Sequence, residues 1–430
     1  MKEIKVGIIG FGTVGAGVAT NLLKNGAMIA ERTGVKPVLA GIADIDIERD
    51  RGVDVPKELL TTDADALTAK SDIVVELVGG TTIAKTFIIN ALNQGKSVVT
   101  ANKALLAKHG EELFAAAKKS GTDIFYEASV AGGIPIIKSL REGLAGNRIN
   151  KIYGIMNGTC NYILTRMERE GLDFEPILQD AQKLGYAEAE PSLDIDGFDT
   201  AHKTSILASL AYGEWFGMNP LHIEGIRGIS LTDLRFADEL GYRIKLLGII
   251  KQNEADDIEI RVHPTLISKN VLLADVSEVF NAVMVNGDYV GDTMFYGRGA
   301  GREATASAVV GDIIDICRNQ AAGCQNRIPP FRAGKLYRNI MKMDETLNRY
   351  YLRIQVKDVP GVIAQISTIL GNKQISISSF IQKEGQSQDN VSLLVLTHLS
   401  QEKMIKEAIC GIEQMNEVCE PVKLFRIEDI

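Results

Sequence analysis

A glycine-rich turn directly after the first apolar run restricts the fold of this chain more than any other segment. The run Lys5 to Ile9 reads as a strand, Gly10-Phe-Gly-Thr-Val-Gly15 follows it, and a helical pattern covers Ala16 to Asn25. The GxGxxG spacing alone is weak evidence, but between a strand and a helix it is typical of a βαβ unit that binds a dinucleotide. We therefore predict an α/β fold that begins with a Rossmann-type nucleotide-binding domain.

The residues of this turn have separate expected roles. Gly10 allows the tight turn, Gly12 lets a pyrophosphate approach the backbone, and Gly15 lets the helix pack closely on the strand. The phosphates are expected at the positive end of the helix, where they meet backbone N–H groups. These N–H groups belong to Phe11, Thr13 and Val14.

The end of the second expected strand, Lys36 to Ala43, bears on the choice of cofactor. Asp44 follows this strand, where an acid binds the adenosine ribose hydroxyls and disfavours a 2′-phosphate. Arg49 and Arg51 come soon after and could instead hold that phosphate. The predicted cofactor is therefore NAD(P), and Asp44 favours NAD.

Two further buried strands of this domain end in candidate ligand-binding residues. The strand from Ser71 to Val78 ends at Gly79, and the strand from residue 95 onward ends at Thr100 and Lys103. Ligands of open α/β sheets bind at such carboxyl ends. The alternative for Lys103 is a solvated side chain at a helix start.

Glu127 lies in a glycine-rich turn that closes the nucleotide-binding half. Its carboxylate could serve as an oxygen ligand for a hard cation or cap the helix expected from Ile136. From the residues alone, the cap is the favoured interpretation.

A strongly acidic segment, Gly185 to Lys203 (GYAEAEPSLDIDGFDTAHK), precedes an uncharged helical run over residues 204–212. Asp199 is expected to cap this helix, and Lys203 lies four residues on, on the same face. One interpretation is an acidic loop with a surface ion pair. The other is a site for a zwitterionic substrate, with carboxylates for its ammonium group and Lys203 for proton transfer.

The middle of the chain predicts a second, mixed or antiparallel sheet. Helices are expected over residues 162–170 and 304–317, and a glycine-rich turn at 297–302 is expected to return the chain to the cofactor. The strands of this sheet are expected at residues 148–156, 225–229, 242–251, 258–264 and 282–285.

The last 80 or so residues have the pattern of an independently folding module. Strands and helices alternate in the order βαββαβ, which is that of a ferredoxin-like domain. The turn Asp358-Val-Pro-Gly-Val362 offers free N–H groups at the first strand–helix junction. A simple dimer contact is the alternative role for such a module.

Composition excludes several classes of function. A net charge of −8 argues against a nucleic-acid or anionic-membrane partner, and no apolar run reaches the length of a membrane span. The five cysteines lack CxxC pairing, which disfavours a disulfide framework or a zinc site. Because the first strand starts so close to Met1, we expect no signal peptide and a cytoplasmic location.

Over essentially its whole length the chain resembles homoserine dehydrogenases that have a C-terminal amino-acid-binding (ACT) regulatory domain. The resemblance rests on GYAEAEPSLDIDGFDTAHK, NGTCNYIL, TANKALLA, EASVAGGIPII, GRGAGREATASAVVGDI and DVPGV. It implies reversible NAD(P)H-dependent reduction of L-aspartate 4-semialdehyde to L-homoserine, feedback regulation by threonine, and a homo-oligomer, either a dimer or a tetramer. The implied domains are 1–130 with a return segment at about 301–330, 131–300, a linker at 331–349, and 350–430.

The resemblance also implies a role for individual residues. Lys203 matches the catalytic lysine, Asp199 its neighbouring carboxylate and Lys103 a second lysine of the site. Further matches are substrate residues (Gly158, Thr159, Tyr186, Glu188, Asp194), cofactor contacts (Gly79, Thr100, Gly185, Gly301), a site for Na⁺ or K⁺ (Glu127, Val130, Gly132, Ile134) and an effector loop (Asp358, Val359, Pro360, Gly361, Val362).

Two rival functions use the same features differently. An acylating aldehyde dehydrogenase would use Cys160 as nucleophile, but no histidine stands in a recognisable partner motif for it. A non-catalytic NAD and amino-acid sensor would leave the acidic segment and Lys203 without a purpose.

Overall fold

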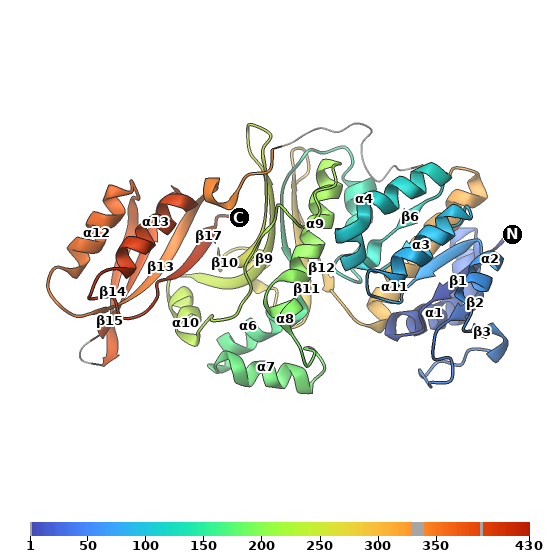
Figure 1. Ribbon diagram of the computed structural model, residues 1–430, viewed down its shortest axis with the longest axis horizontal. Coiled ribbons are helices and arrows are strands. Elements are labelled where there is room, and N and C mark those ends of the chain that lie inside the picture. Colours follow the sequence, from blue (N-terminus) through green and yellow to red (C-terminus); the bar gives the residue numbers. More distant parts are fainter. Residues whose placement is uncertain (1, 328–338, 388–389) are drawn as a thin grey trace. The chain divides into compact units, whose positions relative to one another are not determined.

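The computed structural model describes residues 2–327, 339–387 and 390–430. Residues 331–338 of the expected linker lie outside the described residues. The chain divides into two compact units: residues 1–158, 199–221 and 279–337 form the first, and residues 159–198, 222–278 and 338–430 form the second. Most of the elements are labelled in Figure 1.

The first unit is built on a six-stranded parallel sheet in the order β3-β2-β1-β4-β5-β6. This is the strand order of the doubly wound Rossmann fold, with the order reversing between β1 and β4. The α/β prediction is therefore confirmed. The strands are β1 (Glu3–Ile9), β2 (Lys36–Ala43), β3 (Leu60–Thr61), β4 (Ile73–Glu76), β5 (Ser97–Thr100) and β6 (Ile124–Phe125).

The remaining elements of this unit are helices around the sheet and a three-stranded antiparallel group in which β11 pairs with β7 and β12. The helices are α1 (Thr13–Thr33), α2 (Ala64–Lys70), α3 (Ile83–Asn93), α4 (Lys103–Ser120), α5 (Ile136–Lys138), α9 (Phe198–Tyr212) and α11 (Arg302–Ala322). The antiparallel strands are β7 (Ile149–Ile155), β11 (Phe280–Gly287) and β12 (Gly291–Arg298).

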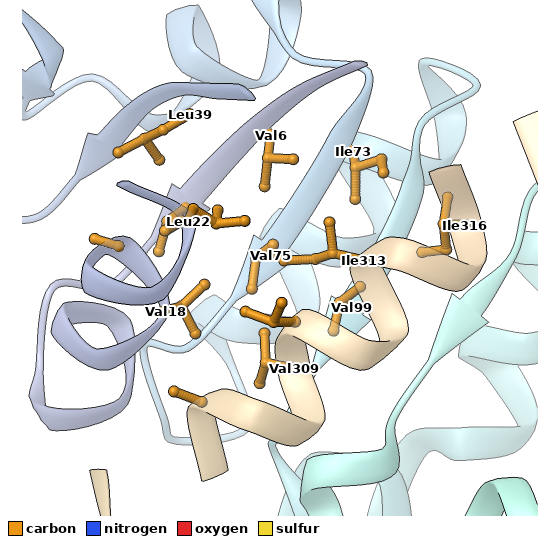
Figure 2. Close-up of a cluster of buried hydrophobic side chains, with 14 of the residues drawn as sticks. Val6, Val18, Leu22, Leu39, Ile73, Val75, Val99, Val309, Ile313 and Ile316 are labelled. Atoms are coloured by element: carbon orange, nitrogen blue, oxygen red, sulfur yellow. The ribbon is translucent and has the colours of Figure 1, made fainter. Parts of the chain in front are cut away.

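Helix α11 packs beside α1 on the parallel sheet, although almost 270 residues separate their ends in sequence. Val309 and Ile313 of α11 join Val18 of α1 and Val75 of β4 in one buried cluster (Figure 2). The helices can approach this closely because Gly17 has no side chain: a Cβ at this position would lie only 2.8 Å from the Arg302 carbonyl oxygen. A distant segment thus completes the core beneath the glycine-rich turn.

The second unit contains an antiparallel hairpin, β9 (Tyr242–Gln252) and β10 (Ile258–Ser268), and the C-terminal module. The short strand β8 (His222–Ile223) pairs with β10. The helices outside the module are α6 (Gly158–Glu170), α7 (Phe174–Lys183), α8 (Ser192–Ile195) and α10 (Leu231–Glu239).

The C-terminal module has the predicted βαββαβ order and a four-stranded sheet β17-β13-β15-β14. Apolar residues of helices α12 and α13 and of this sheet form one buried hydrophobic cluster. Strand β17 also pairs in parallel with β10, so the module continues the hairpin's sheet. Its elements are β13 (Leu347–Lys357), α12 (Val362–Asn372), β14 (Ile377–Ser387), β15 (Asn390–Thr397), β16 (Ser400–Gln401), α13 (Glu402–Glu413) and β17 (Lys423–Glu428).

Two predictions about the middle region were wrong. Residues 225–229 form turns instead of a strand, with the Ile226 N–H donating to the Ile195 carbonyl. The glycine-rich turn at 297–302 is shorter than predicted, because residues 291–298 form strand β12. The predicted mixed sheet was otherwise found, and within the described residues no helix is long and apolar enough to cross a membrane.

Candidate active site

The first turn of α9 contains a buried ion pair. Asp199 and Lys203, one helical turn apart, are 7% and 8% exposed, and Lys203 Nζ lies 2.7 Å from Asp199 Oδ2. The same ammonium donates to the Met156 carbonyl oxygen at 2.6 Å. The surface ion-pair interpretation is therefore wrong. The Asp199 carboxylate accepts from the side chains of Asn157 and Lys203.

Two further side chains hold the Asp199 carboxylate. Lys103, the first residue of α4, places Nζ 3.2 Å from Oδ1, and Asn157 donates from Nδ2 to Oδ2 at 2.8 Å. Burial by itself raises the pKa of Asp199, but Lys203, Lys103 and Asn157 outweigh it and hold that pKa well below its usual range. Asp199 is therefore a fixed negative charge between two ammonium groups.

Asn157 is the residue of this cluster that the sequence analysis did not single out. It is buried and lies two residues after the end of β7, next to the predicted substrate residue Gly158. A polar side chain at the end of a strand, beside a predicted site residue, was the available signal.

Five of the predicted substrate and cofactor residues belong to the second unit. Thr159 donates its hydroxyl to the Tyr186 carbonyl oxygen at 2.6 Å and lies 3.4 Å from Asp194 Oδ2. The carbonyl of Asp194 accepts from the Cys160 thiol at 3.2 Å. Glu188 is exposed, and Gly185 has a positive φ of 75°. Tyr186 and Glu188 of the turn after α7 and Asp194 of α8 thus belong to the same segment, and Thr159 contacts Tyr186 and Asp194.

The glycine-rich turn after β1 has the geometry of a phosphate cradle. A Cβ on Gly15 would lie 2.1 Å from the Gly10 carbonyl oxygen, whereas a Cβ on Gly12 would meet nothing within 4 Å. Within the described residues no side chain caps the first turn of α1, which also has no acidic residue. Open space above uncapped N–H groups at a helix start fits the phosphates of a dinucleotide.

The structure differs from the prediction at Phe11. Its N–H donates to Asp44 Oδ2 at 2.6 Å, so it is not directed at a phosphate as expected. Arg51 donates to Asp44 Oδ1 at 3.3 Å and its guanidinium lies 5.0 Å from the Phe11 ring centroid. Asp44 and Arg51 therefore stand together beside the turn, and the negative charge of Asp44 is partly balanced.

Glu127 uses its side chain as a helix cap. Its two carboxylate oxygens accept from the N–H groups of Ile137 and Lys138 at 2.8 and 2.7 Å, and burial raises its pKa to about 7. Among the residues that the structure describes, no group of three His, Cys, Asp or Glu side chains could hold a metal ion. In the same turn Gly132 has a positive φ of 51°.

In the C-terminal module, the turn between β13 and α12 is exposed from Asp358 to Gly361. Gly361 has a φ of 93° at the start of α12, and in the described structure no side chain caps that helix. The turn therefore presents free N–H groups and one carboxylate.

Family models match three successive parts of the chain. The model for the homoserine dehydrogenase NAD-binding domain matches residues 10–127, and that for homoserine dehydrogenase matches residues 135–314. The ACT domain model matches residues 350–409. These parts contain the glycine-rich turn, the Asp199–Lys203 pair and the exposed turn between β13 and α12, respectively.

Individual proteins agree with these models over their whole length. The chain is 45% identical to a homoserine dehydrogenase of Neisseria gonorrhoeae, with 100% of both chains covered. The crystal structure of a homoserine dehydrogenase from Thiobacillus denitrificans matches with a TM-score of 0.95 at 44% identity, covering 100% of this chain and 99% of that one. A hyperthermophilic archaeal homoserine dehydrogenase in complex with NADPH matches with a TM-score of 0.62 at 29% identity, covering 74% and 98%. The chain therefore belongs to the homoserine dehydrogenase family of NAD(P)-dependent oxidoreductases, in the form that has a C-terminal ACT domain.

Proposed function

We propose that Lys203 is the proton donor when this homoserine dehydrogenase reduces L-aspartate 4-semialdehyde to L-homoserine. An ammonium group has three N–H donors. Among the described residues, Met156 and Asp199 occupy two of them. The third is available to a substrate oxygen, and this observation carries the assignment.

The chemistry that Lys203 must perform follows from the charge that develops. Bound NAD(P)H supplies the hydride, so negative charge builds on the aldehyde oxygen, and a proton donor within hydrogen-bond reach lowers the barrier. Lys203 forms an ion pair with Asp199, and Lys103 adds a second positive charge beside the same carboxylate. In the oxidising direction Lys203 accepts the alcohol proton, so we expect that direction to be favoured by higher pH.

The acidic turn of the second unit is our candidate for binding the substrate's ammonium group. Glu188 and Asp194 provide carboxylates, and the hydrogen bonds of Thr159 to this turn hold Tyr186 and Asp194 in place. With Gly158, these residues form the proposed substrate wall.

For the cofactor we propose use of both NAD(H) and NADP(H). The proposed contacts are the Gly10–Gly15 turn with Gly79, Thr100, Lys103, Gly185 and Gly301. Asp44 favours the free ribose hydroxyls of NAD, but its pairing with Arg51 reduces repulsion and offers a positive charge to a 2′-phosphate. Side-by-side kcat/KM measurements are the test: Arg51→Ala should lower the value for NADPH more than that for NADH.

A monovalent-cation site is proposed in the turn after Glu127. Because both Glu127 oxygens already accept from backbone N–H groups, we expect the ion to be held mainly by carbonyl oxygens from this turn. Activity in K⁺ or Na⁺, compared with tetramethylammonium at equal ionic strength, tests this proposal. Equal rates would contradict it.

We further propose that the ACT module binds an amino-acid effector, L-threonine, at the Asp358–Val362 turn, between two copies of the chain. The Asp358 carboxylate can bind the ammonium group of the effector. The uncapped N–H groups at the start of α12 can bind its carboxylate. This arrangement requires at least a dimer.

We propose residues 1–130 with 301–330, residues 131–300 and residues 350–430 as the functional domains. The five free cysteines suit a reducing cytoplasm.

The reaction distinguishes this proposal from its rival. The acylating alternative requires Cys160 to attack the aldehyde, yet this thiol is fully buried and donates to the Asp194 carbonyl. Steady oxidation of NADPH or NADH on addition of aspartate semialdehyde, without phosphate and with one homoserine formed per cofactor, is the expected result. Cofactor reduction that requires phosphate would favour the acylating reaction.

A further inference from the structure

Glu76 is a buried carboxylate for which the reaction described above has no role. It ends the apolar strand β4 and is 0% exposed. Burying a carboxylate is costly unless hydrogen bonds compensate for its lost hydration. The groups that hydrogen-bond to Glu76 therefore indicate which part of the structure this buried carboxylate holds in place.

The Glu76 carboxylate connects the loops that follow two neighbouring strands. One oxygen accepts from the Val78 N–H at 2.9 Å, in the loop after β4. The other accepts from the Thr100 hydroxyl at 2.7 Å, at the end of β5. Gly79 and Asn102 add further hydrogen bonds to it. A single side chain thus accepts from both loops at the carboxyl edge of the sheet.

Asn102 extends this connection to the start of α4. Its N–H donates to Thr100 Oγ1 at 3.0 Å, and its Nδ2 donates to the Gly80 carbonyl at 2.7 Å. Its Oδ1 accepts from the Leu105 N–H at 3.0 Å and so caps the helix. The next residue is Lys103, whose Nζ lies 3.2 Å from Asp199 Oδ1.

We propose that Glu76 is a positioning residue for the reaction: through Thr100 and Asn102 it fixes the start of α4 so that Lys103 reaches Asp199. This inference rests on the proposed role of Lys103 and deepens it. Burial raises the pKa of Glu76, whereas the hydrogen bonds from Thr100, Val78, Gly79 and Asn102 oppose that rise. All four groups act as donors, so the site requires two acceptor oxygens.

Glu76→Gln is the informative substitution, because it keeps the size of the side chain and turns one acceptor into an NH₂ donor. We expect kcat to fall about tenfold, the effect of losing roughly one hydrogen bond to a charged group. In a Lys103→Ala background the same substitution should lower kcat less than about twofold, since residues that act as one unit are not additive.

Two further variants separate positioning from loss of stability. Ser97→Ala removes a buried hydroxyl at the opposite end of β5, where Ser97 accepts from the Asp123 N–H, and it should leave kcat unchanged. Thr100→Val removes the link to Asn102 without changing residue 76, and it serves if Glu76→Gln fails to fold. The dissociation constant of NADPH, measured by fluorescence, should rise in Glu76→Gln because Gly79 and Gly80 lose their anchor, but it should not rise in Ser97→Ala.

The outcomes are distinct. If Lys103→Ala retains the wild-type kcat, the role of Lys103 fails and the inference fails with it. If Lys103→Ala is impaired but Glu76→Gln and Thr100→Val lower kcat by the same factor in both backgrounds, or leave it unchanged, only the positioning role of Glu76 is overturned.

Discussion

The Asp199 carboxylate contacts side chains from three separate segments: it accepts from Lys203 on its own helix and from Asn157 after β7, and it forms an ion pair with Lys103 at the start of α4. Asn157 contributes no charge, so its role is to orient the carboxylate. Asn157→Ala should lower kcat about tenfold or more, because a hydrogen bond to a charged group contributes roughly 1.5–3 kcal/mol.

A matched control for this prediction lies on β7, the strand that precedes Asn157. Asn150 of β7 donates to Asn286 Oδ1 at 3.0 Å, and Asn150→Ala should leave kcat unchanged. Equal losses in the two variants would show that the effect comes from the strand and not from Asp199.

The lowered pKa of Asp199 also predicts a pH dependence of stability. Because the folded-state pKa lies below the unfolded value of about 3.9, the stabilisation is complete above about pH 5 and is lost as pH falls through the folded-state pKa. The free energy of urea unfolding of the wild type should therefore exceed that of Asp199→Asn by more at pH 6 than at pH 3. A difference independent of pH would contradict this account of Asp199.

At the residue scale, the sequence was informative within one element. The four-residue spacing of Asp199 and Lys203 predicted a shared helical face, because spacing along a helix sets direction. The contacts of Lys103 and Asn157 with Asp199 could not be predicted in the same way, because they depend on how three separate elements pack.

Strand β17 meets its neighbours through buried charges. Arg426 is 1% exposed and pairs with Glu402 of α13 and with Glu224, whose Oε2 lies 2.7 Å from Nη1. Arg426→Met would leave the fully buried Glu402 without this partner, which should lower the free energy of unfolding of the C-terminal module by about 3–5 kcal/mol.

The control for this element is an exposed ion pair. Lys36 and Glu3 are 48% and 59% exposed, so Lys36→Met should change the free energy of unfolding by less than about 1 kcal/mol. Urea unfolding gives both values, with a probe in the C-terminal module for Arg426→Met and a probe in the first unit for Lys36→Met. Similar effects of the two substitutions would refute the importance of burial at Arg426.

At the element scale, periodicity predicted long elements better than short, irregular ones. Strands β9 and β10 have long apolar runs and were found where expected. The apolar residues Ile226 and Ile229 suggested a strand, but they lie in a turn whose apolar side chains are buried. Strand β12 was missed because its side chains are mostly half-buried or exposed and it contains Gly291 and Gly297.

For the whole molecule, the proposed effector site predicts inhibition by L-threonine that depends on the Asp358 turn. Asp358→Asn removes the carboxylate for the ammonium group, so the threonine concentration for half inhibition should rise at least tenfold while kcat without threonine stays unchanged. An effector acts only through its different affinities for two states, commonly by about 1–3 kcal/mol.

Substitution is a sharper test here than removal of the module near Asn348. Arg261 of β10 is 1% exposed, and its guanidinium pairs with Glu428 and Asn348. Truncation would remove both partners and leave this buried positive charge exposed or unpaired in the catalytic part. Lys373→Ala, at an exposed ion pair with Glu407, is the control. If both variants remain as sensitive to threonine as the wild type, the effector does not bind at this turn.

Measurement of kcat for Lys203→Ala, in the reduction of aspartate semialdehyde with saturating NADPH, tests the central claim most directly. We predict a fall of about two to four orders of magnitude, the usual effect of losing a general acid or base, with the dissociation constant of NADPH little changed. A kcat within a few-fold of the wild type would contradict the assignment of proton transfer to Lys203.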